Sequence, residues 1–136
     1  MSSASKPVKI APSVLASDFG KLADEIKAVS LAGADWIHLD AMDGRFVPNL
    51  TFGPPVIKAV REITDVYFDA HLMIEEPDVI LEDFASAGVQ GITVHVEVCT
   101  HLNRTLSRIR ELGCRAGVAV NPATGVDSLA LSLIHI

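Results

Sequence analysis

The 136-residue chain has few basic residues and no long hydrophobic run. Its 11 lysines and arginines are outnumbered by 17 aspartates and glutamates, which gives a formal net charge of -6 at pH 7. We expect no nucleic-acid partner, because such binding depends on neutralising phosphates. No apolar run approaches the roughly 20 residues of a membrane span. The N-terminus also has no hydrophobic signal-peptide core, so we expect no membrane partner and a cytoplasmic location.

Cysteine is scarce, and no dinucleotide-binding motif is present. Cys99 and Cys114 form neither a CxxC motif nor a disulfide framework, so free thiols in a reducing compartment are expected. No motif places a base near either thiol, which argues against catalysis by cysteine. The chain has no GxGxxG after its first predicted strand, which disfavours a dinucleotide-binding sheet.

Strands and helices alternate regularly along the chain. The sequence predicts helices that begin near residues 18, 55, 75 and 100, and strands over residues 9–15, 36–41, 66–73, 91–96 and 115–120. Pro12 lies inside the first of these strands, where a strand end tolerates it. Strict alternation indicates parallel strands with right-handed crossovers. We therefore predict an α/β fold, a parallel (β/α)₈ TIM barrel. Only about its first five βα units fit here, since a full barrel needs about 250 residues.

The most informative stretch covers residues 36–48, an apolar strand that ends in a turn-rich loop. His38 and Asp40 are two residues apart, so on a strand they project from the same face. Imidazole and carboxylate together suit a divalent transition metal. The alternative at this point is a buried His–Asp pair that only fixes the strand end. The loop over residues 43–54 is long for a βα connection, as lids and binding loops often are.

Polar side chains recur at the carboxyl ends of the predicted strands, where barrel active sites lie. They are Ser13; His38, Asp40 and Met42; Asp69, His71 and Met73; Thr93, His95 and Glu97; and Asn121. Each has an ordinary explanation. A serine can cap a backbone group, methionines can fill a cavity, Asp69 can be structural, and His95 and Glu97 can support their neighbours. Together, however, His38, Asp40 and His71 supply three ligands for a catalytic metal.

Several motifs resemble the ribulose-phosphate 3-epimerase family. The similarity runs in order from about residue 8 to residue 124. The matching runs are 10–18 (IAPSVLASD), 38–49 (HLDAMDGRFVPN), 52–54 (FGP), 71–77 (HLMIEEP), 93–97 (TVHVE) and 117–124 (GVAVNPAT).

The resemblance implies an isomerase that interconverts D-ribulose 5-phosphate and D-xylulose 5-phosphate, a step of the pentose phosphate pathway. It implies that His38, Asp40 and His71 bind one divalent ion (Zn, Fe, Mn or Co) and that Asp40 is the catalytic proton acceptor. Ser13, His71, Met42 and Met73 are implied to contact the substrate, a small phosphorylated ketose. A homo-oligomer is expected for the intact protein.

The resemblance also indicates what this chain does not contain. The family's strand-seven aspartate, which is the second acid and fourth ligand, is absent, as are the phosphate-binding glycines. We therefore expect the N-terminal portion of an epimerase: a polar lead (1–7), a partial barrel (8–130) and a non-family tail (131–136). The tail reads LSLIHI, one translation of a transposon end used in sequencing libraries. We hypothesise a sequencing artefact, with a chance apolar tail as the alternative, and count no site residue there.

Three other functions are weighed against this one. The 136 residues alone are expected to be poorly soluble and inactive, so one alternative is an inert fragment with residual metal binding. A second is an epimerase acting on a hexulose 6-phosphate, because these residues do not measure substrate length. A third, a sugar-phosphate decarboxylase, would need an Asp-x-Lys-x-x-Asp arrangement, and the run from Asp40 to Asp43 has no lysine.

Overall fold

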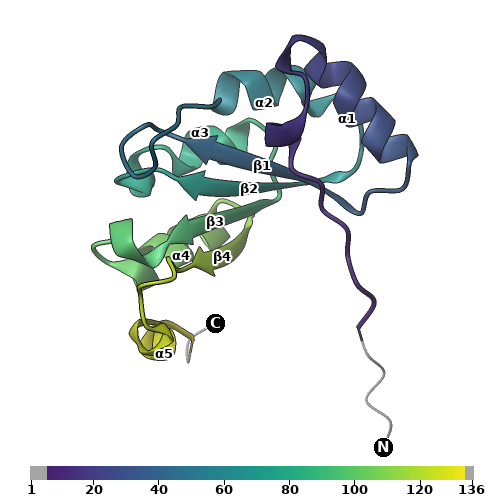
Figure 1. The fold of residues 1–136 in the computed structure, drawn as a ribbon. Helices are drawn as coiled ribbons and strands as arrows, with labels where there is room; N and C mark the ends of the chain where they lie inside the picture. The colour runs from purple at the N-terminus through teal and green to yellow at the C-terminus, as the bar shows by residue number, and fades with distance from the viewer. Residues whose placement is uncertain (1–5, 134–136) are drawn as a thin grey trace, which may run out of the picture.

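The computed structural model describes residues 6–133. Within that range four parallel strands form one sheet in the order of the sequence: β1 (Trp36–Met42), β2 (Tyr67–Met73), β3 (Gly91–His95) and β4 (Arg115–Ala119). The α-helices are α1 (Leu22–Leu31), α2 (Pro54–Arg61), α3 (Leu81–Ser86), α4 (Leu102–Glu111) and α5 (Ala130–Leu133). The 3₁₀ turns are η1 (Val14–Ala16), η2 (Phe19–Lys21), η3 (Pro77–Val79), η4 (Val96–Val98) and η5 (Val126–Leu129). The predicted α/β alternation is confirmed (Figure 1).

The prediction of a strand over residues 9–15 is wrong. This segment lies along the edge of β1 without becoming a strand. The carbonyl of Ile10 accepts from the backbone N–H of Trp36 at 3.2 Å, and that of Pro12 accepts from His38 N–H at 2.9 Å. Ser13 and His38 form one isolated parallel bridge. Pro12 has no N–H to donate, and the chain turns into η1 at Val14, so the pairing stops there.

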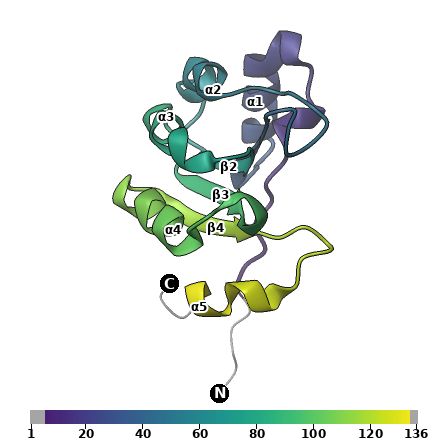
Figure 2. The same ribbon diagram turned by 90° about the vertical axis from the view of Figure 1, so that its left-hand side faces the viewer.

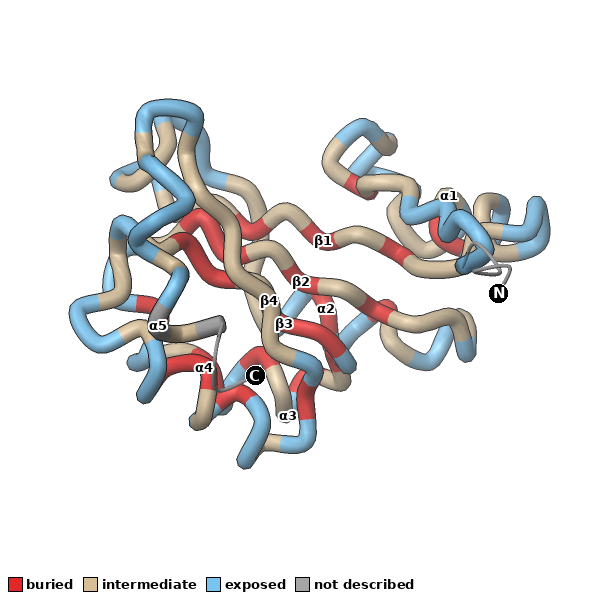
Figure 3. Tube along the Cα trace, turned by 90° about the horizontal axis from the view of Figure 1, so that it is seen from below, coloured by how far each residue is buried: buried red, intermediate tan, exposed pale blue. Residues whose placement is uncertain are grey.

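Burial alternates along the strands, as Figure 3 shows for β1 and β2. On β1, Ile37, Leu39 and Ala41 are fully buried, whereas His38 and Asp40 between them are half-buried. This follows from the pleat, which sends successive side chains to opposite faces. The apolar face therefore packs against helices and leaves the polar face for the site.

The helices supply the other half of one hydrophobic core. Ile57 of α2, Phe84 of α3 and Leu106 of α4 are fully buried and belong to the same cluster as the apolar strand residues. Helices α2, α3 and α4 lie along one side of the sheet, seen most clearly in the turned view (Figure 2). All four strands run in the same direction, so their carboxyl ends meet at one edge of the sheet. Barrel active sites lie at that edge.

Two expectations concern the ends of the chain. The predicted division at residue 130 coincides with the start of α5, and residues 1–5 and 134–136 lie outside the described residues. The boundaries of lead, barrel and tail therefore stay predictions, and His135 is not placed. Among residues 6–133 we find no helix with the length and apolar character that crossing a membrane requires.

Candidate metal centre

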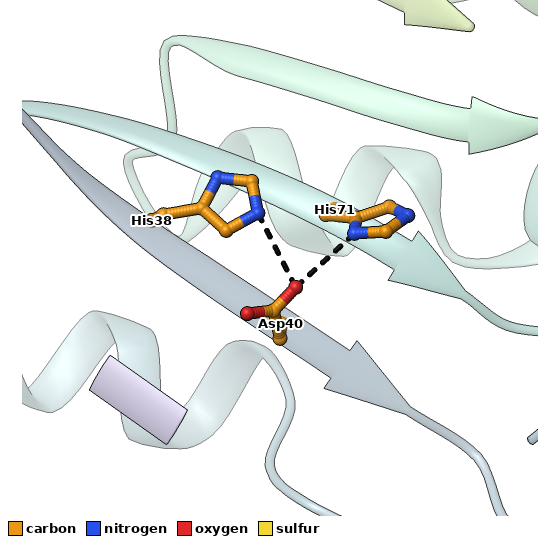
Figure 4. A group of neighbouring side chains, drawn as sticks. All are labelled: His38, Asp40 and His71. Carbon is orange, nitrogen blue, oxygen red and sulfur yellow. Dashed lines mark hydrogen bonds and ion pairs between the residues drawn. The ribbon is translucent and has the colours of Figure 1, made fainter. Parts of the chain in front are cut away.

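The register between β1 and β2 brings the predicted metal ligands together. Asp40 lies directly opposite His71, and His38 lies two residues earlier on the same face. The Oδ1 atom of Asp40 is 3.2 Å from Nε2 of His38 and 3.1 Å from Nδ1 of His71 (Figure 4). One ligand atom from each of the three residues lies within 4.8 Å of the other two. The sequence-based expectation that these side chains converge is therefore confirmed.

This donor set fits a divalent cation. Two imidazole nitrogens and one carboxylate oxygen are ordinary ligands of Zn²⁺ and related ions. Separations of 3.1 and 3.2 Å are the size expected between neighbouring ligands that bond one ion at about 2.0–2.1 Å. The three side chains come from two rigid paired strands, so little rearrangement is needed to reach one ion.

The outward-facing atom of each of the three residues is held by a neighbour. Nδ1 of His38 lies 2.9 Å from Oδ2 of Asp69, and Nε2 of His71 lies 2.8 Å from Nε2 of His95. The hydroxyl of Ser13 donates to Oδ2 of Asp40. Outer hydrogen bonds of this kind orient metal-binding histidines and carboxylates. The arrangement is typical of a metal site, whereas a pair that only fixed a strand end would need no such surround.

Electrostatics keep the carboxylate ionised. Hydrogen bonds from His38 first, then from His71, hold the pKa of Asp40 well below its usual range. The same interactions work on His38 in the opposite direction. Its hydrogen bonds to Asp40 and then to Asp69 raise the pKa of His38 to about 9. A positive charge is therefore strongly favoured between these groups, whether a proton or a metal ion supplies it.

The remaining predicted site residues surround this centre. Ser13 caps η1 and reaches Asp40 from the segment before α1. Met42 and Met73 are register partners, each two residues beyond Asp40 and His71 toward the carboxyl ends of the strands. They share the face of the metal ligands at the edge where a substrate would approach. Met73 is buried and Met42 is half-buried.

The structure adds residues that the sequence reading did not place in the site. Asp69, for which a structural role was expected, contacts His38 directly. Its i, i+2 spacing to His71 repeats that of His38 and Asp40, and this repeat could have revealed it. Thr51, from the long loop, donates to the carbonyl of Asp40 at 2.8 Å and accepts from the N–H of Met42 at 3.0 Å. The loop is thereby pinned to the end of β1.

His95 lies behind His71 and is buried. Its ring stacks on His71 with centroids 4.9 Å apart and an interplanar angle of 23°, and the ring of Phe46 lies 4.8 Å away. Burial first, then the neighbouring His71, lowers the pKa of His95. The expectation that His95 supports a neighbour agrees with this placement.

Comparison with known proteins identifies the family. The profile described as the ribulose-phosphate 3 epimerase family matches residues 9–135. The chain belongs to this family. A ribulose-phosphate 3-epimerase of Synechocystis is 56% identical over 92% of the chain and 55% of its own length. One of Bacillus subtilis is 54% identical over 88% of the chain and 55% of its own length. A chloroplastic ribulose-5-phosphate-3-epimerase of Arabidopsis thaliana is 49% identical over 88% of the chain and 43% of its own length.

The chain thus spans about half the length of these curated ribulose-phosphate 3-epimerases. Solved structures support the fold. KGPDC from Streptococcus mutans, in complex with a sugar phosphate, has a TM-score of 0.57 at 19% identity, over 90% of this chain and 56% of that one. A mandelate oxidase variant with benzaldehyde has a TM-score of 0.58 at 16% identity, over 85% and 43%. The half-length match and the open four-stranded sheet agree with part of a TIM barrel.

Proposed function

We propose that this chain forms the metal-binding half of a ribulose-phosphate 3-epimerase, which interconverts D-ribulose 5-phosphate and D-xylulose 5-phosphate. The observation that carries the proposal is Asp40 held between two imidazole nitrogens, at 3.2 and 3.1 Å. Membership of the family supports the choice of reaction. The substrate class is a small phosphorylated ketose, and one structural neighbour, KGPDC, is described in complex with a sugar phosphate.

His38, Asp40 and His71 would hold one divalent ion, of which Zn, Fe, Mn and Co all suit the donors. When bound, the ion would supply Lewis-acid stabilisation of the negative charge that develops on the sugar oxygens once carbon 3 loses its proton. The hydrogen on carbon 3 lies next to the ketone, so this charge is the main barrier to its removal.

The two oxygens of Asp40 would divide the work. Oδ1 faces the imidazoles of His38 and His71, whereas Oδ2 faces the hydroxyl of Ser13. Oδ2 is therefore the oxygen left to accept the proton of carbon 3, and Ser13 is placed to orient it. The low pKa of Asp40 keeps this oxygen free of a proton at neutral pH. Epimerisation also needs a second acid on the opposite face of carbon 3, which we assign to the half of the family that this chain does not span.

The test is an assay of the full-length protein, meaning this chain continued to the length of its relatives. We expect turnover of D-ribulose 5-phosphate to D-xylulose 5-phosphate and its near-complete loss in Asp40→Asn, which keeps the shape but cannot accept the proton. Asp24→Asn, an exposed aspartate in the first turn of α1, is the matched control. Full activity of Asp40→Asn would show that the assignment of Asp40 is wrong. A hexulose 6-phosphate run in parallel tests substrate length.

The 136 residues alone are proposed to be inactive, because the second acid and the phosphate site lie outside them. The other expectations from the sequence stay predictions. They are a cytoplasmic location, a homo-oligomer for the intact protein, and the absence of nucleic-acid and membrane partners.

A further inference from the structure

His95 has a nitrogen whose partner the hydrogen-bond pattern leaves open. The ring is buried, with a side-chain exposure of 8%. Its Nε2 meets Nε2 of His71 at 2.8 Å, but its Nδ1 is buried and makes no hydrogen bond of good geometry. Oε2 of Glu97 approaches Nδ1 to 3.4 Å. A buried imidazole nitrogen without a partner is costly, so this approach needs an explanation.

Donor and acceptor rules fix where the protons lie once a cation is bound. If Nδ1 of His71 binds the ion, the proton of that ring is on Nε2. That N–H then donates to Nε2 of His95, which must present a lone pair. The proton of His95 is therefore on Nδ1, the nitrogen that faces Glu97. Each link follows from the one before it.

Glu97 is held so that it can accept this proton. Its Oε1 accepts from the backbone N–H of Asn121 and from the hydroxyl of Thr124, the latter at 2.7 Å. These two partners come from the loop after β4, so they fix the carboxylate from outside its own strand. Oε2 is left pointing at His95.

We propose that Glu97 is a positioning residue of the metal centre: acting through the ring of His95, it fixes the tautomer of His71 whose Nδ1 can bind the cation. This inference rests on the proposed function, because it takes His71 as a ligand. It also gives the loop after β4 a role, since Asn121 and Thr124 orient Glu97. Asp69 acts on His38 in the same way, but directly.

The test compares Glu97→Gln with Glu82→Gln in the full-length protein. A glutamine at residue 97 cannot satisfy both neighbours. If its oxygen keeps accepting from Asn121, its NH₂ faces the N–H of His95. If it flips, its NH₂ faces the N–H of Asn121. Glu82, by contrast, pairs with Arg108 on the surface with 73% of its side chain exposed.

Two readouts are needed. The first is the dissociation constant for Zn²⁺, from titration against a competing chelator. We expect it to rise about 10–100-fold in Glu97→Gln, the usual effect of losing an outer-shell partner, and to stay unchanged in Glu82→Gln. The second is the tautomer of His95, from nitrogen NMR of the zinc-loaded wild-type ring, expected to carry its proton on Nδ1. This measurement requires no variant and does not report on a purely structural role.

The outcomes separate this inference from the function it rests on. A wild-type protein that binds no Zn²⁺ overturns both. A wild-type protein that binds Zn²⁺, with His95 protonated on Nε2 or with equal affinity in a folded Glu97→Gln variant, overturns only the role of Glu97.

Discussion

Asp40 and His71 lie directly opposite each other on neighbouring parallel strands, with Oδ1 of one 3.1 Å from Nδ1 of the other. The carboxylate also reaches His38 two residues earlier, so three potential ligands converge from two strands. Because the register of the sheet fixes this relationship, the site is built into the core of the fold and does not depend on a loop.

Metal removal is the first prediction. Incubation of the full-length protein with EDTA should abolish epimerase turnover, because nothing else in this site offsets the charge on the deprotonated sugar. Addition of Zn²⁺, Mn²⁺ or Co²⁺ should restore it, as a coupled assay for D-xylulose 5-phosphate would measure. A thoroughly metal-free protein that keeps its turnover would contradict the proposed function.

The second prediction concerns Gly91, which faces Asp69 across the β2–β3 pair. A Cβ at this position would lie 2.7 Å from Oη of Tyr67 and 2.8 Å from Oδ1 of Asp69. Gly91→Ala should therefore displace Asp69 from His38 and weaken zinc binding by up to about 10–100-fold. Gly125→Ala is the matched control, since no atom lies within 4 Å of its Cβ and its φ is -68°. Equal zinc affinity in the two variants would show that Asp69 does not support the site.

Thiol reactivity is the third prediction. Burial raises the pKa of the Cys99 thiol to about 11, and it also raises the pKa of Cys114. For Cys99 this is about two units above the ordinary value, so the thiolate at pH 8 is about 100-fold scarcer. Alkylation of Cys99 by iodoacetamide should be slow in the native protein and should accelerate as the pH rises toward 11. Peptide mass spectrometry measures the rate, with urea-unfolded protein as the reference. A native rate near the unfolded one at pH 8 would rule this out.

The fourth prediction is that residues 1–136 alone self-associate. Within the described residues β4 pairs only with β3, so one edge of the sheet offers unpaired backbone groups. Exposed strand edges promote aggregation. Size-exclusion chromatography with light scattering should find oligomers or aggregate, whereas the full-length protein should give a defined species. A stable monomer of the 136-residue chain would contradict this prediction.

Local sequence pattern predicted much of the site. The i, i+2 spacing of His38 and Asp40 is enough to place both on one face, and the apolar residues between them are buried as that spacing requires. The register that sets Asp40 opposite His71 depends on long-range pairing, which no local pattern encodes. The convergence was therefore inferred from strand ends and from the family resemblance.

Two features show where the sequence reading failed. Residues 9–15 have an apolar, strand-like pattern, but Pro12 cannot donate and the chain turns at Val14, so only one bridge forms. The contact of Asp69 with His38 crosses between strands, and the nearest local signal was its spacing to His71.

The central claim is that His38, Asp40 and His71 share one divalent cation. Anomalous diffraction from crystals of the full-length protein, grown with Zn²⁺ or Co²⁺, tests it most directly. We expect one peak within about 2.0–2.3 Å of Nε2 of His38, Oδ1 of Asp40 and Nδ1 of His71. Crystals of active, metal-loaded protein that show no peak between these three atoms, or an ion bound elsewhere, would contradict it.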